Sequence, residues 1–172
     1  MHNTDERLIS TYLIAAYTYA LRITASLAVP GRRRLLDVLN FSGGPFIEVT
    51  EPTISFLDPA RSHQAIRRDS LILNRRDLYF VVPIEEAREG SPDMRIQKTP
   101  RQAVIYTQAY LIRGDFHVIE LLNLPDYLSQ DDETYVALTE ASAISIAHPK
   151  SEAIECDVLL INKRKITAIH RP

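Results

Sequence analysis

Only one cysteine occurs in this chain of 172 residues. A single cysteine excludes an intramolecular disulfide and a zinc site built from several cysteines, and it favours a reducing compartment. Cys156 comes just before the apolar run of residues 158–161. We therefore interpret it as a structural thiol and not as a nucleophile.

No apolar run approaches the roughly 20 residues that a helix needs to cross a bilayer. The first ten residues, MHNTDERLIS, are polar and acidic, and they lack the basic flank and apolar stretch of a signal peptide. We therefore expect a soluble, cytoplasmic protein without a membrane partner.

An excess of one charge is also missing, because 20 Lys and Arg residues face 22 Asp and Glu residues, for a net charge of −2. Such a balance does not supply the long-range positive field that gathers nucleic acid non-specifically. A local cluster of arginines has two interpretations: Arg32, Arg33 and Arg34 are a candidate anion-binding patch, with a solvated surface as the alternative.

Motifs for catalysis and metal binding are absent from the sequence. No nucleophile elbow of the form G-x-S-x-G occurs, and the one glycine pair, Gly43 and Gly44, reads as a plain turn. The five histidines show no i, i+4 pair of the kind that binds zinc on a helix. The sequence therefore predicts no catalytic residue, no metal site and no cofactor.

An internal repeat is the strongest feature that the sequence does contain. With an offset of 89, nine of the 35 positions from Tyr17 to Glu51 are identical, where about two are expected by chance. The pairs include Thr18 with Thr107, Glu51 with Glu140 and, as a conservative pair, Phe46 with Tyr135. Beyond this block the offset becomes 88, so that LILNRRDLYFVV from Leu71 aligns with LLINKRKITAI from Leu159.

The repeat predicts two copies of one unit, residues 1–88 and residues 102–172. Residues 89–101 between them contain prolines, a Gly-Ser-Pro turn signal and mixed charge, and they are predicted to form a linker.

Each unit is predicted to be mainly β with a short helix. Residues 103–119, AVIYTQAYLIRGDFHVI, favour a hairpin or one long bent strand, with a bulge or bend at Gly114. RRRLLDVLN and LLNLPDYLSQ space apolar residues as in one or two helical turns. FIEVT and YVALT then alternate as strands, and apolar strands surround Asn74 and Asn162. Closure of each unit as a small β-barrel would remove its exposed edges.

Three segments of the second copy resemble the Sm-like fold of the Sm, LSm and Hfq RNA-binding proteins. They are TQAYLIRGDF with Gly114 and Phe116, YVALTEA from Tyr135 to Ala141, and INKRKITAI from Ile161 to Ile169. The resemblance implies two tandem five-stranded barrels. The sequence departs from the family where the family binds RNA: the closing Arg-Gly is replaced by Asn162-Lys163 and Asn74-Arg75, and a helix-bearing insertion replaces a short loop.

Three classes of function follow, in order of preference. The first is a non-enzymatic interaction or assembly module that pairs strands at barrel edges, with a protein partner or with itself. The second is an RNA-binding or nucleotide-binding regulator that uses six residues at equivalent turns: Asn74, Arg75, Arg76, Asn162, Lys163 and Arg164. The third and weakest is an enzyme of unknown reaction.

Overall fold

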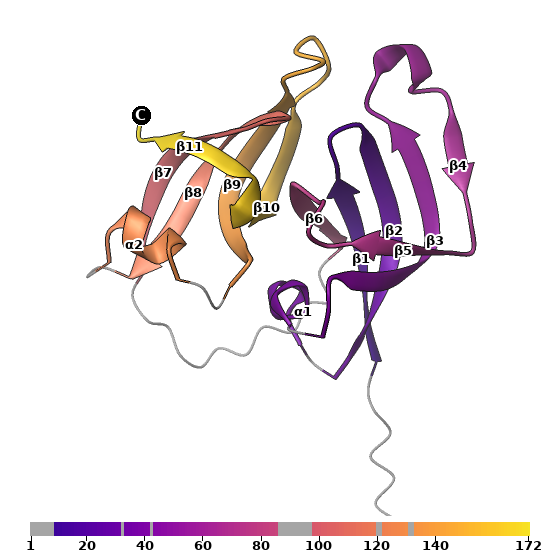
Figure 1. The fold of residues 1–172 in the computed structure, drawn as a ribbon, viewed down its shortest axis with the longest axis horizontal. Coiled ribbons are helices and arrows are strands. Elements are labelled where there is room, and N and C mark those ends of the chain that lie inside the picture. The colour runs from indigo at the N-terminus through magenta and orange to yellow at the C-terminus, as the bar shows by residue number, and fades with distance from the viewer. Residues whose placement is uncertain (1–8, 32, 42, 86–97, 120–121, 131–132) are drawn as a thin grey trace, which may run out of the picture.

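The computed structural model describes residues 9–31, 33–41, 43–85, 98–119, 122–130 and 133–172, and it is mainly β (Figure 1). We refer to residues 9–85 as the first half and to residues 98–172 as the second half. The elements of the first half are β1 (Ile9–Tyr17), β2 (Leu21–Pro30), α1 (Leu35–Asn40), β3 (Phe46–Phe56), η1 (Pro59–Arg61), β4 (Ala65–Arg67), β5 (Ser70–Asn74) and β6 (Phe80–Glu85). Those of the second half are β7 (Lys98–Thr107), β8 (Tyr110–Ile119), α2 (Leu124–Leu128), β9 (Tyr135–Ser145), β10 (Ile154–Asn162), η2 (Lys163–Lys165) and β11 (Ile166–His170).

All described strands belong to one antiparallel sheet, in the order β11-β7-β8-β9-β10-β6-β1-β2-β3-β4. β5 also pairs with β3, so β4 and β5 lie along different parts of the same strand. The sequence predicts two closed barrels, whereas these strands form one sheet that does not close on itself. Pairing of β6 with β10 joins the halves and covers one strand edge of each. In a closed barrel, those edges would be covered by closure of the barrel itself.

The two halves contain the same turn between their first two strands. In the first half, Thr18 Oγ1 accepts hydrogen bonds from the backbone N–H groups of Ala20 and Leu21. In the second half, Thr107 Oγ1 accepts from those of Ala109 and Tyr110. Each threonine therefore fixes a tight β-hairpin in which its hydroxyl replaces a backbone partner.

The same irregularities also recur at positions 89 residues apart. The register of β2 on β3 shifts between Thr24 and Ser26, and that of β8 on β9 shifts between Arg113 and Asp115. The bulge or bend predicted at Gly114 therefore coincides with a register shift, in which two residues of β9, Glu140 and Ala141, lie opposite Gly114. Opposite these shifts Glu51 and Glu140 adopt positive φ angles of 51° and 47°, a conformation that non-glycine residues adopt mainly where the surrounding structure imposes it.

The hydrophobic core forms two clusters, and each contains residues from both halves. One cluster is built mainly from the second half and includes Tyr17 and Phe80 of the first. The other is built mainly from the first half and includes Tyr135 and Leu160 of the second. The halves are therefore joined by packing as well as by strand pairing.

The predicted short helices are confirmed as α1 and α2. α2 begins with Pro125 in its first turn and with Asn123 as its N-cap, whose side chain accepts from the Asp126 N–H at 2.9 Å. β7 begins at Lys98, inside the stretch 89–101 that the sequence predicts as a linker, and residues 89–97 lie outside the described residues.

Candidate functional site

The joint between the halves is the place where distant parts of the chain meet. Leu160 and Ile161 of β10 lie opposite Val81 and Phe80 of β6. Directly beside this short ladder, the Asn162 N–H donates to the Tyr79 carbonyl at 2.9 Å. The two halves thus meet as two strands of one sheet.

The Asn162 side chain extends the contact from within the joint. This side chain is completely buried. Its Nδ2 donates to the carbonyls of Leu78 at 3.0 Å and Arg76 at 3.3 Å, and its Oδ1 accepts from the Arg164 N–H at 3.0 Å. Because an unpaired buried amide is costly, these contacts fix the position of the first-half turn against the second-half turn.

Asn40, the last residue of α1, holds the other end of the joint. Its Oδ1 accepts from the N–H groups of Thr134 at 2.9 Å and Tyr135 at 2.7 Å. Its Nδ2 donates to the Tyr135 carbonyl at 2.9 Å. The amide side chain therefore bonds to the start of β9 as a neighbouring strand would.

Four aromatic rings pack together where β6 meets the β7–β8 turn. Tyr17 stacks on Phe80 with ring centroids 4.5 Å apart, and Tyr110 makes edge contacts with Tyr17, Tyr79 and Phe80. The Tyr110 hydroxyl donates to the Thr18 carbonyl at 2.6 Å. Burial raises the pKa values of Tyr17, Tyr79 and Tyr110, so these phenols are neutral at physiological pH.

The six residues predicted to bind nucleic acid lie on two turns that the joint brings side by side. The contacts of Asn162 with Arg76 and Arg164 span both turns. Four of the six side chains are engaged within the protein. Asn74 bonds Asp77 and the Arg76 N–H, Asn162 is buried, and the Lys163 ammonium donates to the Gln130 carbonyl.

Arg75 is engaged most extensively of the six. Its guanidinium donates to the carbonyls of Val38 at 3.1 Å and Leu39 at 2.9 Å, and also to that of Gly44. It therefore caps the C-terminal end of α1, where carbonyls otherwise lack partners. Burial lowers the pKa of Arg75. Arg76 and Arg164 are exposed, and their side chains make no hydrogen bond within the described residues.

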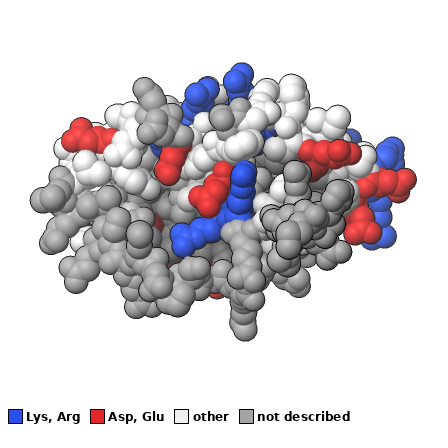
Figure 2. Space-filling view, turned by 90° about the horizontal axis from the view of Figure 1, so that it is seen from below, with Lys and Arg blue, Asp and Glu red and all other residues white. Residues whose placement is uncertain are grey.

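A hollow of about 300 Å³ opens beside these two turns. Its lining comes from both halves and includes Asn40, Arg75, Arg76, Tyr135 and Arg164. Arg76 and Arg164 are the cations there that could contact an anion. In the view from below Figure 1, the described Lys and Arg side chains are interspersed with Asp and Glu side chains (Figure 2).

The predicted arginine patch is not part of this hollow as far as the described residues define it. Arg33 lies 5.0 Å from the centroid of the Phe41 ring, and Arg34 is the exposed N-cap residue of α1. Arg32 lies outside the described residues. The patch therefore stays a prediction.

A second hollow, of about 400 Å³, also lies between the halves. Tyr17, Arg22 and Val82 line it from the first half, and Tyr110 and Ser145 line it from the second, together with two exposed carboxylates, Glu152 and Glu155. Histidine is missing from its described lining, and the described residues contain no group of three or more His, Cys, Asp or Glu side chains placed to hold a metal ion.

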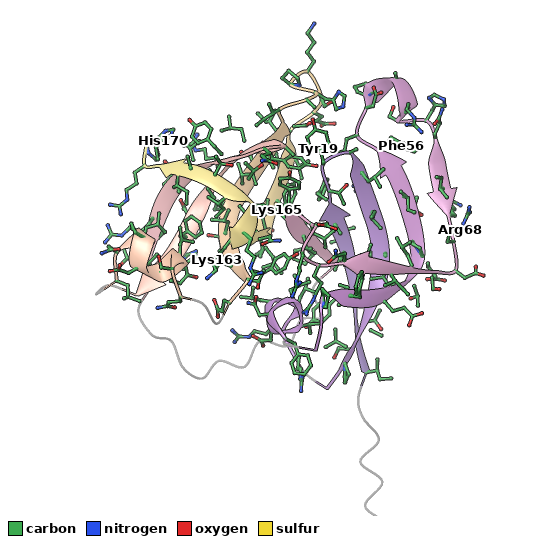
Figure 3. All side chains as sticks on the ribbon, in the orientation of Figure 1. Tyr19, Phe56, Arg68, Lys163, Lys165 and His170 are labelled. Carbon is green, nitrogen blue, oxygen red and sulfur yellow. The ribbon has the colours of Figure 1, made fainter. Side chains whose placement is uncertain are left out.

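The strand path of the sheet ends at β11 in one half and at β4 in the other, on opposite sides of the molecule (Figure 1), and β5 lies off this path beside β3. We call the edge formed by β5 and the adjacent start of β3 the β5 edge, and the edge formed by β11 the β11 edge. Lys163 and Lys165 lie on the turn before β11 and His170 at its end, while Arg68 lies far away beside β4 (Figure 3). Apolar side chains are exposed at the β5 edge, namely Phe46 and Ile72.

Four residues of the joint and the edges were not singled out as site residues from the sequence: Asn40, Phe46, Ile72 and Tyr135. The repeat did pair Phe46 with Tyr135. The sequence does not reveal that Tyr135 is buried and Phe46 is exposed, because their burial depends on which sheet edge is paired with a neighbouring strand.

Comparison with protein-family models, with curated proteins and with solved structures finds no match to this chain. Among the described residues, no helix is both long enough and apolar enough to cross a membrane.

Proposed function

We propose that this protein is a non-enzymatic assembly module, made of two copies of one Sm-like unit, that binds a protein strand at the free edges of its sheet. Strand addition of this kind uses backbone hydrogen bonds for affinity and side-chain positions for specificity. The proposal retains the cytoplasmic location expected from the single cysteine.

Shared strand order supports two copies of one unit. The path β6-β1-β2-β3, with β5 on β3, has the same sequence of connections as β11-β7-β8-β9-β10. The recurring threonine turn, register shift and positive φ angle occur at the positions that the sequence repeat pairs. Irregularities of the backbone are rarely shared by unrelated strands, because they depend on particular local packing.

One observation carries the assembly function: the internal joint is itself a strand added to a sheet edge. β6 is the last strand of the first half, and it completes the edge of β10 in the second half. The equivalent β5 edge is open and presents exposed Phe46 and Ile72. An open edge with exposed apolar residues is a ready site for another strand.

Affinity selection tests this function. A library of random linear peptides is selected on the immobilised protein, and the recovered peptides are titrated against wild type, Ile72→Lys and Ile146→Lys. Ile146 is a matched control, because it is also exposed but lies in the loop after β9. We expect Ile72→Lys to weaken binding about tenfold or more, because its charge would be desolvated in the complex. Equal binding to all three proteins, or no recovered peptide, contradicts the proposal.

The second candidate function is RNA or nucleotide binding. The observation that favours it is the meeting of the two predicted turns across the joint, with exposed Arg76 and Arg164 beside one hollow. A double variant, Arg76→Ala with Arg164→Ala, is expected to lower the salt dependence of oligonucleotide binding by about two charges. Arg113→Ala, an exposed arginine of β8, is the control. Failure to bind any oligonucleotide at low salt disposes of this candidate.

A further inference from the structure

We infer, resting on the proposed function, that the strand received at the β5 edge is β11 of a second copy of this chain. The two copies are related head to tail. Each contact then repeats, between molecules, the pairing that β6 makes with β10 inside one molecule.

The β5 edge corresponds to β10, which is the strand that the second half contributes to the joint. Tyr135 and Leu160 are 0% and 4% exposed, because the joint covers them. The residues that the repeat aligns with them, Phe46 and Ile72, are 62% and 68% exposed. The same two positions are therefore apolar in both halves and differ in burial only where a neighbouring strand is missing.

The β11 edge corresponds to β6, which is the strand that the first half contributes to the joint. In β6, Phe80 and Val81 are fully buried in the joint. With the offset of 88 they correspond to Ala168, which is exposed, and Ile169, which is half-buried. One molecule therefore carries both surfaces of the contact, the β5 edge and the β11 edge. Pairing the β5 edge of one copy with the β11 edge of the next makes a heterologous interface that can repeat from copy to copy.

The internal joint also sets the register of the contact between copies. Leu160 lies opposite Val81, so Ile72 is placed opposite Ile169 of the second copy. Asn162 Nδ2 donates to the carbonyls of Arg76 and Leu78. Its counterpart, Asn74, would donate to the carbonyls of Arg164 and Ile166 of the second copy. In the structure Asn74 Nδ2 donates to the Asp77 carboxylate instead, at 2.8 Å.

The contact between copies is weaker than the internal joint. Phe80 of β6 and Tyr79 just before it supply aromatic packing, whereas their counterparts in β11 are Thr167 and Ala168. Asn40 bonds to both backbone groups of Tyr135, whereas its counterpart, Ser129, uses its hydroxyl within α2. Association is therefore reversible and dependent on concentration, while the two halves of one chain remain joined.

Light scattering on the intact protein over micromolar to millimolar concentrations tests the inference. We expect the mass of wild type and of Ile146→Lys to rise from the 19.6 kDa of one chain towards multiples of it. Ile72→Lys should remain at the mass of one chain, and Asn74→Ala should weaken association about tenfold through lost hydrogen bonds. A constant mass of one chain for wild type, or association that Ile72→Lys does not change, overturns the inference.

Cross-linking tests the register directly. In a Cys156→Ser background, Ile72→Cys and Ile169→Cys are made in separate proteins, which are mixed and oxidised. A disulfide between Ile72→Cys and Ile169→Cys is expected. Ile72→Cys mixed with Ala168→Cys should not cross-link, because residue 168 is one position out of register and its side chain points to the opposite face of the sheet. Equal yields from both mixtures overturn the inference. If selected peptides bind at Ile72 while the protein stays a single chain, the proposed function holds and only the second-copy partner is wrong.

Discussion

The Asn40 side chain of the first half bonds both backbone polar groups of Tyr135 in the second, accepting from its N–H at 2.7 Å and donating to its carbonyl at 2.9 Å. Asn40→Ala removes both bonds to Tyr135, which is fully buried. We expect a loss of roughly 2–4 kcal/mol in the free energy of unfolding, because buried backbone groups lose their partners. Urea unfolding followed by circular dichroism measures the loss.

Ser129→Ala is the control for that variant, because Ser129 occupies the equivalent position and donates only to the Pro125 carbonyl of its own helix. We expect a change within about 1 kcal/mol. Equal losses from both variants would show that Asn40 does not hold the halves together.

The two repeat-related asparagines give a second prediction. Asn162→Ala leaves the Leu78 and Arg76 carbonyls without their amide donor inside the joint, and we expect it to cost about 2–4 kcal/mol of stability. Asn74 is partly exposed and bonds Asp77, so Asn74→Ala should cost less than about 1 kcal/mol. Thermal unfolding at low protein concentration compares them, and a larger loss for Asn74→Ala would contradict the account.

How far the sequence predicts this structure differs from feature to feature. The short helices, the hairpin and the irregularity of the β8–β9 register at Gly114 are predictable, because apolar spacing, turn residues and glycine act over a few neighbours. The pairing of β6 with β10 is not predictable in the same way, because Phe80 and Ile161 are far apart in the chain and either strand could pair elsewhere. For the same reason the sequence predicts two barrels where one open sheet is found.

The candidate site shows the same division. The repeat identifies Asn74 and Asn162 as equivalent, and the structure places both at turns. The sequence does not reveal that Asn162 is buried and Asn74 partly exposed, since burial depends on the neighbouring strand. Arg75 reads as an anion ligand from its chemistry, yet it bonds carbonyls at the end of α1.

Alkaline pH should unfold the protein through its tyrosines. Burial raises the pKa above 10.0 for five of them: Tyr17, Tyr79, Tyr110, Tyr127 and Tyr135. The folded protein holds these phenol protons more tightly than the unfolded chain does. Their stabilising contribution is therefore complete below pH about 10 and is lost as the pH rises towards the raised values.

The measurement is a titration of tyrosinate absorbance alongside the circular dichroism of the sheet. We expect a late rise in absorbance that coincides with loss of the sheet signal. Ionisation of all tyrosines near pH 10 with the sheet intact would contradict the prediction.

Cys156 should react slowly at neutral pH. Burial, followed by the nearby Glu155 and Asp157 carboxylates, raises the pKa of this thiol from 9.0 to about 11. The thiolate is the reactive species, so we expect reaction with a disulfide reagent about a hundredfold slower than for an unperturbed thiol. Addition of urea should restore the ordinary rate, and a fast reaction of the folded protein would contradict this assignment.

Amide hydrogen exchange at low and high protein concentration tests the central claim most directly. If the open edges pair between copies, protection of β5 (Ser70–Asn74) and β11 (Ile166–His170) should rise together with concentration, while that of β2, already paired on both sides, stays constant. Protection of β5 and β11 that does not change with concentration would show that the edges remain unpaired and would contradict assembly through them.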